Sequence, residues 1–451
     1  MGLIVAMYLW RFPVGVSDCL EVMCDARSSH SAWAVFTKYV GLSAETTKLR
    51  PLRHVQAWWL MWLAEQGHVS YHSVVRGVHA VLAFVWVGLL TLAARPRTWH
   101  GVTALAVALM ALVGMHTSIG LLNGAFPVNH FLLVAEACLL VIVLAHTGGG
   151  WWVDATLALT LIVATLNLES GLMVGVTAVA CRVVGWPGIT RRTVIITVAL
   201  GAIYTVSRVG LLGITSGTFG ERESGYFGER LSPSQQRERF GKHPAILYAY
   251  NVTAAAATVV ASEPRAGVSA LAKAATSGAV TPESGINMAS SVLTTALIGW
   301  AWWRSRRDAA AVEARRILNV TAMVLVANAA FSFSYLKDEI MAPAAGVYAL
   351  GAYVAWSMAL DRVSRAGRAG PRVAFAVVLV LASTLWALRA MGLPHMLDAA
   401  AFRTRNDWAM VKPSEYGDEE TLVSQLKSEA LRVRTTPLAL MPHWAEGVWG
   451  E

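Results

Sequence analysis

The chain is poor in charged residues, in lysine and in cysteine, and each shortage narrows the class of protein. Only 14% of its 451 residues are charged and its mean hydropathy is +0.50, whereas soluble domains carry about a quarter charged residues. Seven lysines against thirty arginines are typical of a bacterial genome of high GC content. The four cysteines have no metal-binding spacing, and the neighbours Cys19 and Cys24 leave a disulfide open without requiring one. The composition indicates a bacterial membrane protein.

Acidic residues are nearly absent from one set of gaps between apolar stretches. These gaps hold fourteen Arg or Lys against two acids, Asp308 and Glu313. The gaps are residues 95–100, 146–150, 182–192, 304–316 and 362–372. Because short loops rich in arginine stay in the cytoplasm, we expect these loops to be cytoplasmic. They also account for most of the net charge of +9, so the expected partner is a lipid bilayer and no nucleic acid.

The apolar stretches predict an all-α protein, a bundle of about 11 transmembrane helices with interfacial helices and long non-cytoplasmic loops. Ten expected spans are residues 74–94, 102–122, 131–145, 151–166, 170–184, 194–213, 288–303, 317–333, 343–360 and 373–391. The first stretch, residues 2–16, contains Arg11 and Pro13 and is shorter than the roughly 20 residues of a full span. Either the chain begins inside its first helix or this helix relies on its neighbours. We expect a multi-pass protein of the bacterial inner membrane.

The remaining segments fall outside the bilayer. A transmembrane domain of residues 1–391, with outside loops 17–69 and 214–287, precedes a non-cytoplasmic tail of residues 392–451. Tryptophan-rich stretches in the first loop suit helices that lie in the interface. The apolar stretch 246–262 is expected as a re-entrant or surface-lying segment, because the residues after it are too polar to return as a span. An amphipathic helix is expected near residues 422–433 of the tail.

Two acids follow the first apolar stretch. Asp18 and Glu21 are three residues apart and would share one face of a helix. Such a carboxylate pair could act as a general base or hold a divalent cation. They could equally be solvated loop acids, as could the nearby Asp25.

Several cations are candidates for binding phosphate, because guanidinium and ammonium groups supply fixed positive charge and donors. Arg222 and Arg230 lie in the large outside loop, and Lys337 lies in a short later loop. Arg208 differs, since it stands inside an apolar stretch, where it must either snorkel outward or pair with a buried acid.

The order of these features resembles the GT-C class of membrane glycosyltransferases, in its protein O-mannosyltransferase-like and aminoarabinose transferase-like branches. Asp18 or Glu21 stands where the acid of the class falls, in the outside loop after the first helix. The other matching segments, in chain order, are Arg50-Pro51-Leu52, the histidine His79 in the next span, Asn167-Leu168-Glu169-Ser170-Gly171, and Tyr335 with Lys337-Asp338-Glu339. Asn167 departs from the basic residue of the class.

The resemblance implies transfer of one sugar from a polyprenyl phosphate to a lipid, glycan or protein acceptor, with inversion at the anomeric carbon. Asp18 or Glu21 would deprotonate the acceptor. Substrate contacts would come from Arg50, His79, Asn129, His130, Arg222, Arg230 and Lys337. Of these, Lys337 and the loop arginines would stabilise the leaving phosphate.

One departure from the class concerns the second acid, which many members have before the fourth helix. Here Asn129 and His130 occupy that loop, with Glu136 two turns deeper. Asn129 cannot act as a base, while His130 could serve as metal ligand or proton acceptor. The need for a divalent cation therefore stays open. The alternatives are a transporter or flippase, or a catalytically inactive membrane scaffold.

Overall fold

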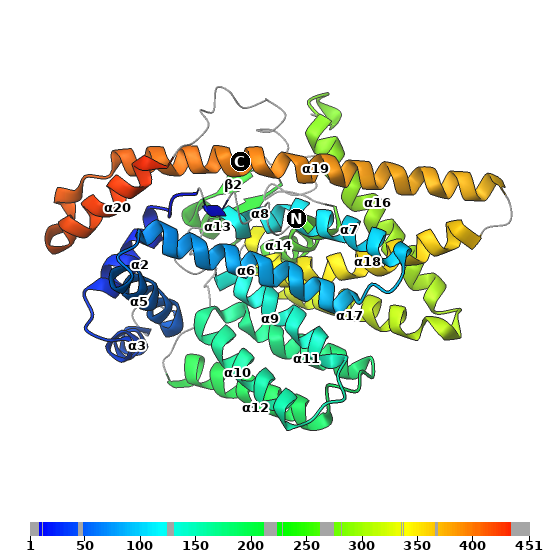
Figure 1. Ribbon diagram of the computed structural model, residues 1–451, viewed down its shortest axis with the longest axis horizontal. Coiled ribbons are helices and arrows are strands. Elements are labelled where there is room, and N and C mark those ends of the chain that lie inside the picture. The colour runs from blue at the N-terminus through cyan, green and yellow to red at the C-terminus, as the bar shows by residue number, and fades with distance from the viewer. Residues whose placement is uncertain are drawn as a thin grey trace.

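The computed structural model describes residues 9–10, 12–43, 48–123, 130–211, 223–227, 229–261, 275–280, 282–334, 336, 338–365 and 369–433. Almost all of these residues are helical, which confirms the predicted all-α class. The one sheet in these ranges is a two-stranded hairpin of β1 (Ser224–Tyr226) and β2 (Glu229–Leu231), with Ser224 opposite Leu231. Figure 1 shows a long helix, α19 (Ala369–Met410), running along the longest axis of the molecule.

Three short helices gather at one end of α19, which Figure 1 shows on the left. They are α2 (Ser17–Arg27), α3 (Ala32–Gly41) and α5 (Pro51–Gln66), and α5 packs against both of the others. The Ser31 hydroxyl caps α3 by accepting a hydrogen bond from the Ala34 amide at 3.1 Å. Pro51 opens α5 at a position where a missing N–H costs nothing.

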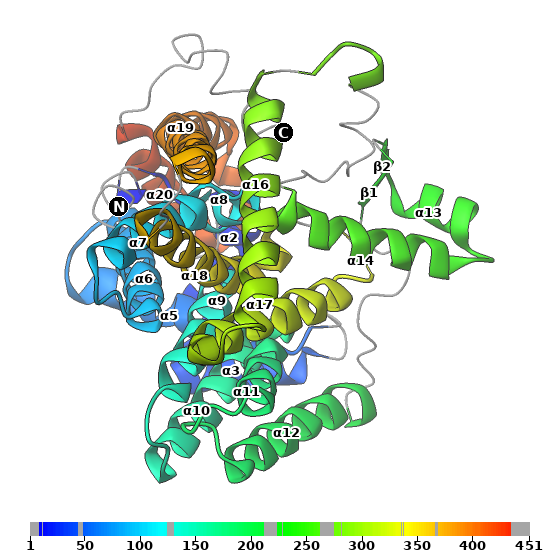
Figure 2. The same cartoon turned by 90° about the vertical axis from the view of Figure 1, so that its right-hand side faces the viewer.

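The body of the molecule is a helical bundle. In chain order its helices are α6 (Tyr71–Ala94), α7 (Trp99–Gly114), α8 (His116–Asn123), α9 (His130–Ala145), α10 (Trp151–Asn167), η1 (Glu169–Leu172), α11 (Met173–Val183), α12 (Arg191–Thr205), the π-helix η2 (Val206–Leu211), α13 (Pro233–Phe240), α14 (Pro244–Val260), α16 (Pro282–Ser305), η3 (Ala309–Ala311), α17 (Val312–Phe331), η4 (Asp338–Met341) and α18 (Ala342–Arg365). Figure 2 shows α12 at the edge of this bundle, while α13 and the hairpin lie beside α14 on another side.

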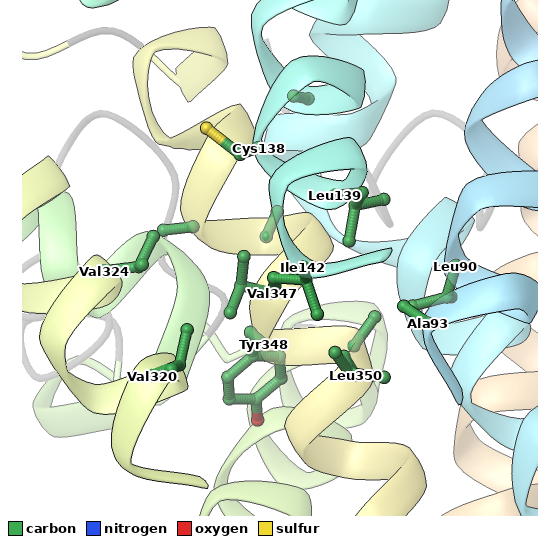
Figure 3. Packing of buried hydrophobic residues seen from close by; sticks show 14 of the residues in the cluster. Leu90, Ala93, Cys138, Leu139, Ile142, Val320, Val324, Val347, Tyr348 and Leu350 are labelled. Carbon is green, nitrogen blue, oxygen red and sulfur yellow. The ribbon is translucent and has the colours of Figure 1, made fainter. Parts of the chain in front are cut away.

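Helix α18 forms the centre of the bundle and packs against α7, α9, α16 and α17. Figure 3 shows Val347, Tyr348 and Leu350 of α18 among side chains of α6, α9 and α17. The Tyr348 hydroxyl is hydrogen-bonded to Thr295 at 2.8 Å, which satisfies its polar atom inside an apolar core. A central helix buried on nearly all sides explains why its sequence is apolar all round.

Four helices in the described part of the chain are long and apolar enough to cross a membrane, at Tyr71–Ala94, Arg191–Gly210, Glu339–Arg365 and Arg372–Met410. Two of them present apolar side chains outward: Val198 of α12 is 54% exposed and Val380 of α19 is 64% exposed. Exposed aliphatic surface of this extent suits contact with lipid. The chain is a membrane protein. Shorter apolar helices, such as Phe131–Ala145 and Trp151–Asn167, coincide with other expected spans.

The structure differs from the sequence expectations in three places. The stretch expected as one span at residues 102–122 is divided into α7 and α8, because the backbone at Met115 is extended. The last expected span does not end near residue 391, since α19 continues to Met410 with Pro394 inside it. The predicted amphipathic helix of the tail is present as α20 (Glu420–Arg432). Of the first expected helix, residues 2–8 and 11 lie outside the described ranges, residues 9–10 are helical, and residues 12–16, which were expected in the same helix, are not helical.

Candidate functional site

A buried carboxylate joins two arginines from distant parts of the chain. Arg50 donates to Glu169 from Nε at 2.9 Å and from Nη2 at 2.5 Å. Arg208 approaches the other oxygen of Glu169 at 3.2 Å. The three side chains are 10–20% exposed. Each stands where a helix begins or changes its geometry: Arg50 caps α5, Glu169 opens η1, and Arg208 lies in the π-helix η2, a distortion that is frequent at functional sites.

This cluster of Arg50, Glu169 and Arg208, here named the anion cluster, carries more positive than negative charge. Burial raises the pKa of the Glu169 carboxyl, but Arg50 and Arg208 outweigh burial and hold that pKa below its usual value. Glu169 therefore stays ionised, and among the described side chains of the cluster two guanidinium charges face one carboxylate charge. An excess positive charge that is shielded from water attracts an anion more strongly than an exposed one does.

A large apolar groove opens next to the anion cluster. It lies between α11, α12 and α17 and has a volume of about 1020 Å³. Apart from Thr197 and Thr205, its lining is apolar. Its lining includes Leu172, the last residue of the η1 turn that Glu169 opens, and Val206, two residues before Arg208. The lining of the groove therefore comes within one helical turn of Glu169 and of Arg208 along the chain.

A second polar group extends from the anion cluster along α5. His54 stands one helical turn after Arg50, and its ring stacks on Tyr39 at 3.3 Å between centroids. The Tyr39 hydroxyl donates a hydrogen bond to the Asp25 carboxylate, and Lys38 approaches the same carboxylate at 3.6 Å. Asp25, on α2, is thus separated from Arg50 by two side chains.

Burial and the surrounding cations together determine the protonation state of His54. Burial, followed by the charges of Arg53, Lys38, Arg50 and Lys48, lowers the pKa of His54 to about 3. The imidazole is therefore neutral at physiological pH and cannot add a positive charge. It can still hold the Tyr39 ring in place by stacking.

The structure brings only part of the predicted site together. Arg50 lies in the anion cluster, and Glu169 of the predicted 167–171 motif is its partner. Glu21 is exposed on α2, one helical turn before Asp25. Asp18 and His130 belong to α2 and α9, and Arg230 to β2, but their side chains lie outside the described residues. Asn129, Arg222 and Lys337 lie outside them entirely.

His79, a predicted substrate contact, is 3% exposed within α6. Its Nδ1 is 2.9 Å from Nη1 of Arg76, and Arg76 in turn donates to the Phe12 and Pro13 carbonyls at 2.9 and 2.8 Å. These contacts tie the segment before α2 to α6. They place His79 in a structural network, away from the groove.

Sequence reasoning recognised some of these residues and missed their relations. The sequence predicted that Arg208 either snorkels outward or pairs with a buried acid, and it placed Glu169 in a motif. It did not predict that Arg208 and Glu169 pair with each other. It mentioned Asp25 only as a neighbour of Asp18 and Glu21. The spacing could have suggested more, because Glu21 and Asp25 are four residues apart and share one helical face.

Among the residues that the structure describes, no group of three or more His, Cys, Asp or Glu side chains is placed to hold a metal ion. Comparisons with protein-family models, with curated proteins and with solved structures find no match. The resemblance to the GT-C class accordingly stays a prediction from the order of motifs, and function has to be argued from the groove and the charges beside it.

Proposed function

We propose that the chain is a polytopic glycosyltransferase of the bacterial inner membrane, with about eleven spans, that takes a sugar from a polyprenyl phosphate on the outer face. One observation carries this proposal: the lining of an apolar groove includes Leu172 and Val206, which stand within three residues of Glu169 and Arg208, and Glu169 pairs with both Arg208 and Arg50. A polyprenyl phosphate has the matching chemistry, a long apolar chain that ends in an anion.

The dimensions of the groove support a lipid chain as its occupant. Its lining on α17 extends from Ala322 to Phe331, which is about 14 Å at 1.5 Å per residue. That is roughly half of a 30 Å hydrocarbon core, or one leaflet. The anion cluster would then lie at headgroup depth, where a phosphate could replace part of the Arg50 and Arg208 contacts with Glu169.

The general base of this reaction belongs to α2. Asp25 is our first candidate, because it accepts a hydrogen bond from Tyr39, whose ring stacks on His54, one helical turn after Arg50. Asp18 and Glu21, which the resemblance favours, stand on the same helix. The base would take the proton of the acceptor as it attacks the anomeric carbon, and the arginines would stabilise the leaving phosphate.

Sugar transfer by the reconstituted protein tests this function. The donors are polyprenyl phosphates that carry radiolabelled mannose, glucose or aminoarabinose, and the acceptor source is a vesicle preparation of bacterial inner membrane. We expect label to move to the acceptor with at least one donor, and Asp25→Asn to slow transfer by about 10² to 10⁴. Asp361→Asn is the matched control, because Asp361 is an exposed acid on α18 paired only with Arg365 among its described contacts.

Two results would overturn parts of the proposal. Absence of transfer from every donor, with intact donor binding, would favour the flippase or scaffold alternatives. Full activity in Asp18→Asn, Glu21→Gln and Asp25→Asn would remove the base from α2 while leaving the donor site in place.

A further inference from the structure

A second, polar pocket lies on α5, away from the groove. It has a volume of about 280 Å³ and is formed between the end of α2 and the second half of α5. Arg27, Ser29 and His30 contribute one side, and Trp58, Trp62 and Glu65 the other. Small-molecule sites have about 300 to 1,000 Å³, so this pocket has room for a single small unit.

One wall of the pocket is aromatic. Trp58 and Trp62 are one helical turn apart on α5, and their rings are 12° from parallel with 6.5 Å between centroids. The Trp58 Nε1–H donates to the Ser29 carbonyl at 3.0 Å, which fixes this indole against the end of α2. Two nearly parallel indoles offer a broad, rigid surface to one face of a ligand.

The charges of the pocket disfavour an ionic ligand. Arg27 Nε is 2.8 Å from the Glu65 carboxylate, and the Tyr71 hydroxyl donates to the same oxygen at 3.1 Å. An ammonium group, which aromatic walls otherwise bind well, would have to displace Arg27 from Glu65. An anion would have to displace Glu65 from Arg27. The paired groups still offer a rim of donors and acceptors to a neutral ligand.

We propose that this pocket binds one uncharged pyranose unit of a saccharide. The C–H-rich face of the sugar would lie on Trp58 and Trp62, and its hydroxyls would meet Arg27, Glu65 and His30. Such a ligand combines an apolar face with many neutral hydrogen-bonding groups, as the two sides of the pocket require.

The position of the pocket gives this saccharide a role. Trp58 and Trp62 are eight and twelve residues after Arg50 on the same helix, which corresponds to about 12 and 18 Å along its axis. The bound unit is therefore not the one that reacts beside Arg50. It is a further unit of a glycan acceptor, and this identification as acceptor, unlike the binding itself, rests on the proposed glycosyltransferase function.

Saturation-transfer NMR on the full chain in lipid nanodiscs tests the binding. Nanodiscs are required because maltoside detergents carry sugar headgroups. The probes are methyl α-mannopyranoside, methyl β-glucopyranoside and N-acetylglucosamine, with phosphocholine and inorganic phosphate as charged probes. We expect transfer to the ring protons of at least one pyranose, and Trp62→Ala to weaken its binding about fivefold or more.

Trp99→Ala is the matched control, since Trp99 is an exposed indole at the start of α7 that does not line the pocket. Thermal unfolding confirms that both variants fold. Equal loss in the two variants, preferential binding of phosphocholine or phosphate, or no pyranose signal would each overturn the saccharide site. Polyprenyl phosphate binding, measured on the same samples, tests the donor site separately. If the protein binds a pyranose but no polyprenyl phosphate, the proposed glycosyltransferase function is refuted and the saccharide pocket is retained.

Discussion

Glu169 connects three segments of the chain that are far apart in sequence. It accepts from Arg50, which is 119 residues away, and pairs with Arg208 of η2. Removal of the shared acid leaves two buried guanidinium groups facing each other. Such uncompensated buried charge is far more costly than an exposed ion pair is favourable.

We expect Glu169→Gln to lower the free energy of unfolding at neutral pH by roughly 3 kcal/mol. The pKa of Glu169 is lowered in the folded protein, so its contribution is fully present above its unfolded pKa and is lost as pH falls through the folded pKa. The unfolding of wild type and variant should therefore converge in acid. Denaturation of the purified protein in a pH series from 7.5 to below 4 measures this difference.

Glu238→Gln is the control for this experiment, because Glu238 is an exposed acid on α13. It should unfold like the wild type at every pH. If the free energy of unfolding of Glu169→Gln stays below that of the wild type by the same amount down to the lowest pH, Glu169 is not ionised in the anion cluster.

The sequence predicted which residues belong to the candidate site better than it predicted which of them pair with each other. Arg50 and Glu169 stood in separate motifs of the sequence, and the structure makes them one ion pair. Nothing local specifies that pairing, since it depends on how α5 packs against α10. Asp18, Glu21 and Asp25 could not be ranked either, because all three are acids on α2. Asp25 is distinguished by its contacts with Tyr39 and Lys38 of α3.

Among the helices, α20 shows how an amphipathic pattern becomes a docked element. Its apolar face contributes Leu422, Val423 and Leu426 to a cluster with α2, α5 and α6. The Leu426 carbonyl is 2.9 Å from Nε2 of the buried His72. Figure 1 shows α20 beside the end of α19, on the same side of the molecule as α2 and α5.

Leu426→Ala should therefore reduce the free energy of unfolding by about 3 kcal/mol, as for other buried leucines. It should also expose α20 to protease before the rest of the chain. Limited proteolysis and thermal unfolding check both effects. Ser424→Ala, on the exposed face of α20, should change neither, and resistance of Leu426→Ala to protease would show that α20 is not held by this face.

Helices could be predicted from sequence where apolar runs are long, and their interruptions could not. The break at Met115 separates α7 from α8 directly before the polar residues His116, Thr117 and Ser118, inside a stretch that is otherwise apolar enough to be expected as one span. At Gly120 of α8, a Cβ atom would clash with the side chain of Glu339 in η4. This close approach depends on residues more than two hundred positions apart, which periodicity does not report.

The whole molecule has a polarity that the arginines of its loops predict. Residues 304–316 and the end of α18 lie opposite to α2, α3 and α5 (Figure 1). The tail with α20 lies at the candidate-site end. This arrangement agrees with cytoplasmic arginine-rich loops and a site on the outer face.

Cysteine labelling in intact cells tests this topology. In a background without the four native cysteines, we expect Ser414→Cys to react with a membrane-impermeant maleimide and Ala310→Cys to react only after lysis. Ala310 is preferable to Ser305, because Ser305 is buried whereas Ala310 is exposed. Labelling of both positions from the same side would refute the assignment.

The central claim is that the groove and the anion cluster together bind a polyprenyl phosphate. Gly175 and Gly88 both have open space where a Cβ atom would stand, but only Gly175 lines the groove. Gly175→Leu should therefore obstruct the lipid chain, while Gly88→Leu adds the same side chain elsewhere.

Arg208→Ala removes one charge-assisted contact to phosphate, worth about 1.5–3 kcal/mol, or roughly ten- to a hundredfold in affinity.

The decisive measurement is the affinity of the purified protein in nanodiscs for undecaprenyl phosphate, with undecaprenol as the uncharged comparison. We predict that wild type and Gly88→Leu bind the phosphate alike, that Gly175→Leu and Arg208→Ala bind it at least tenfold more weakly, and that undecaprenol binds weakly to all four. No binding of undecaprenyl phosphate by the wild type, or binding that neither Gly175→Leu nor Arg208→Ala changes, would contradict the account.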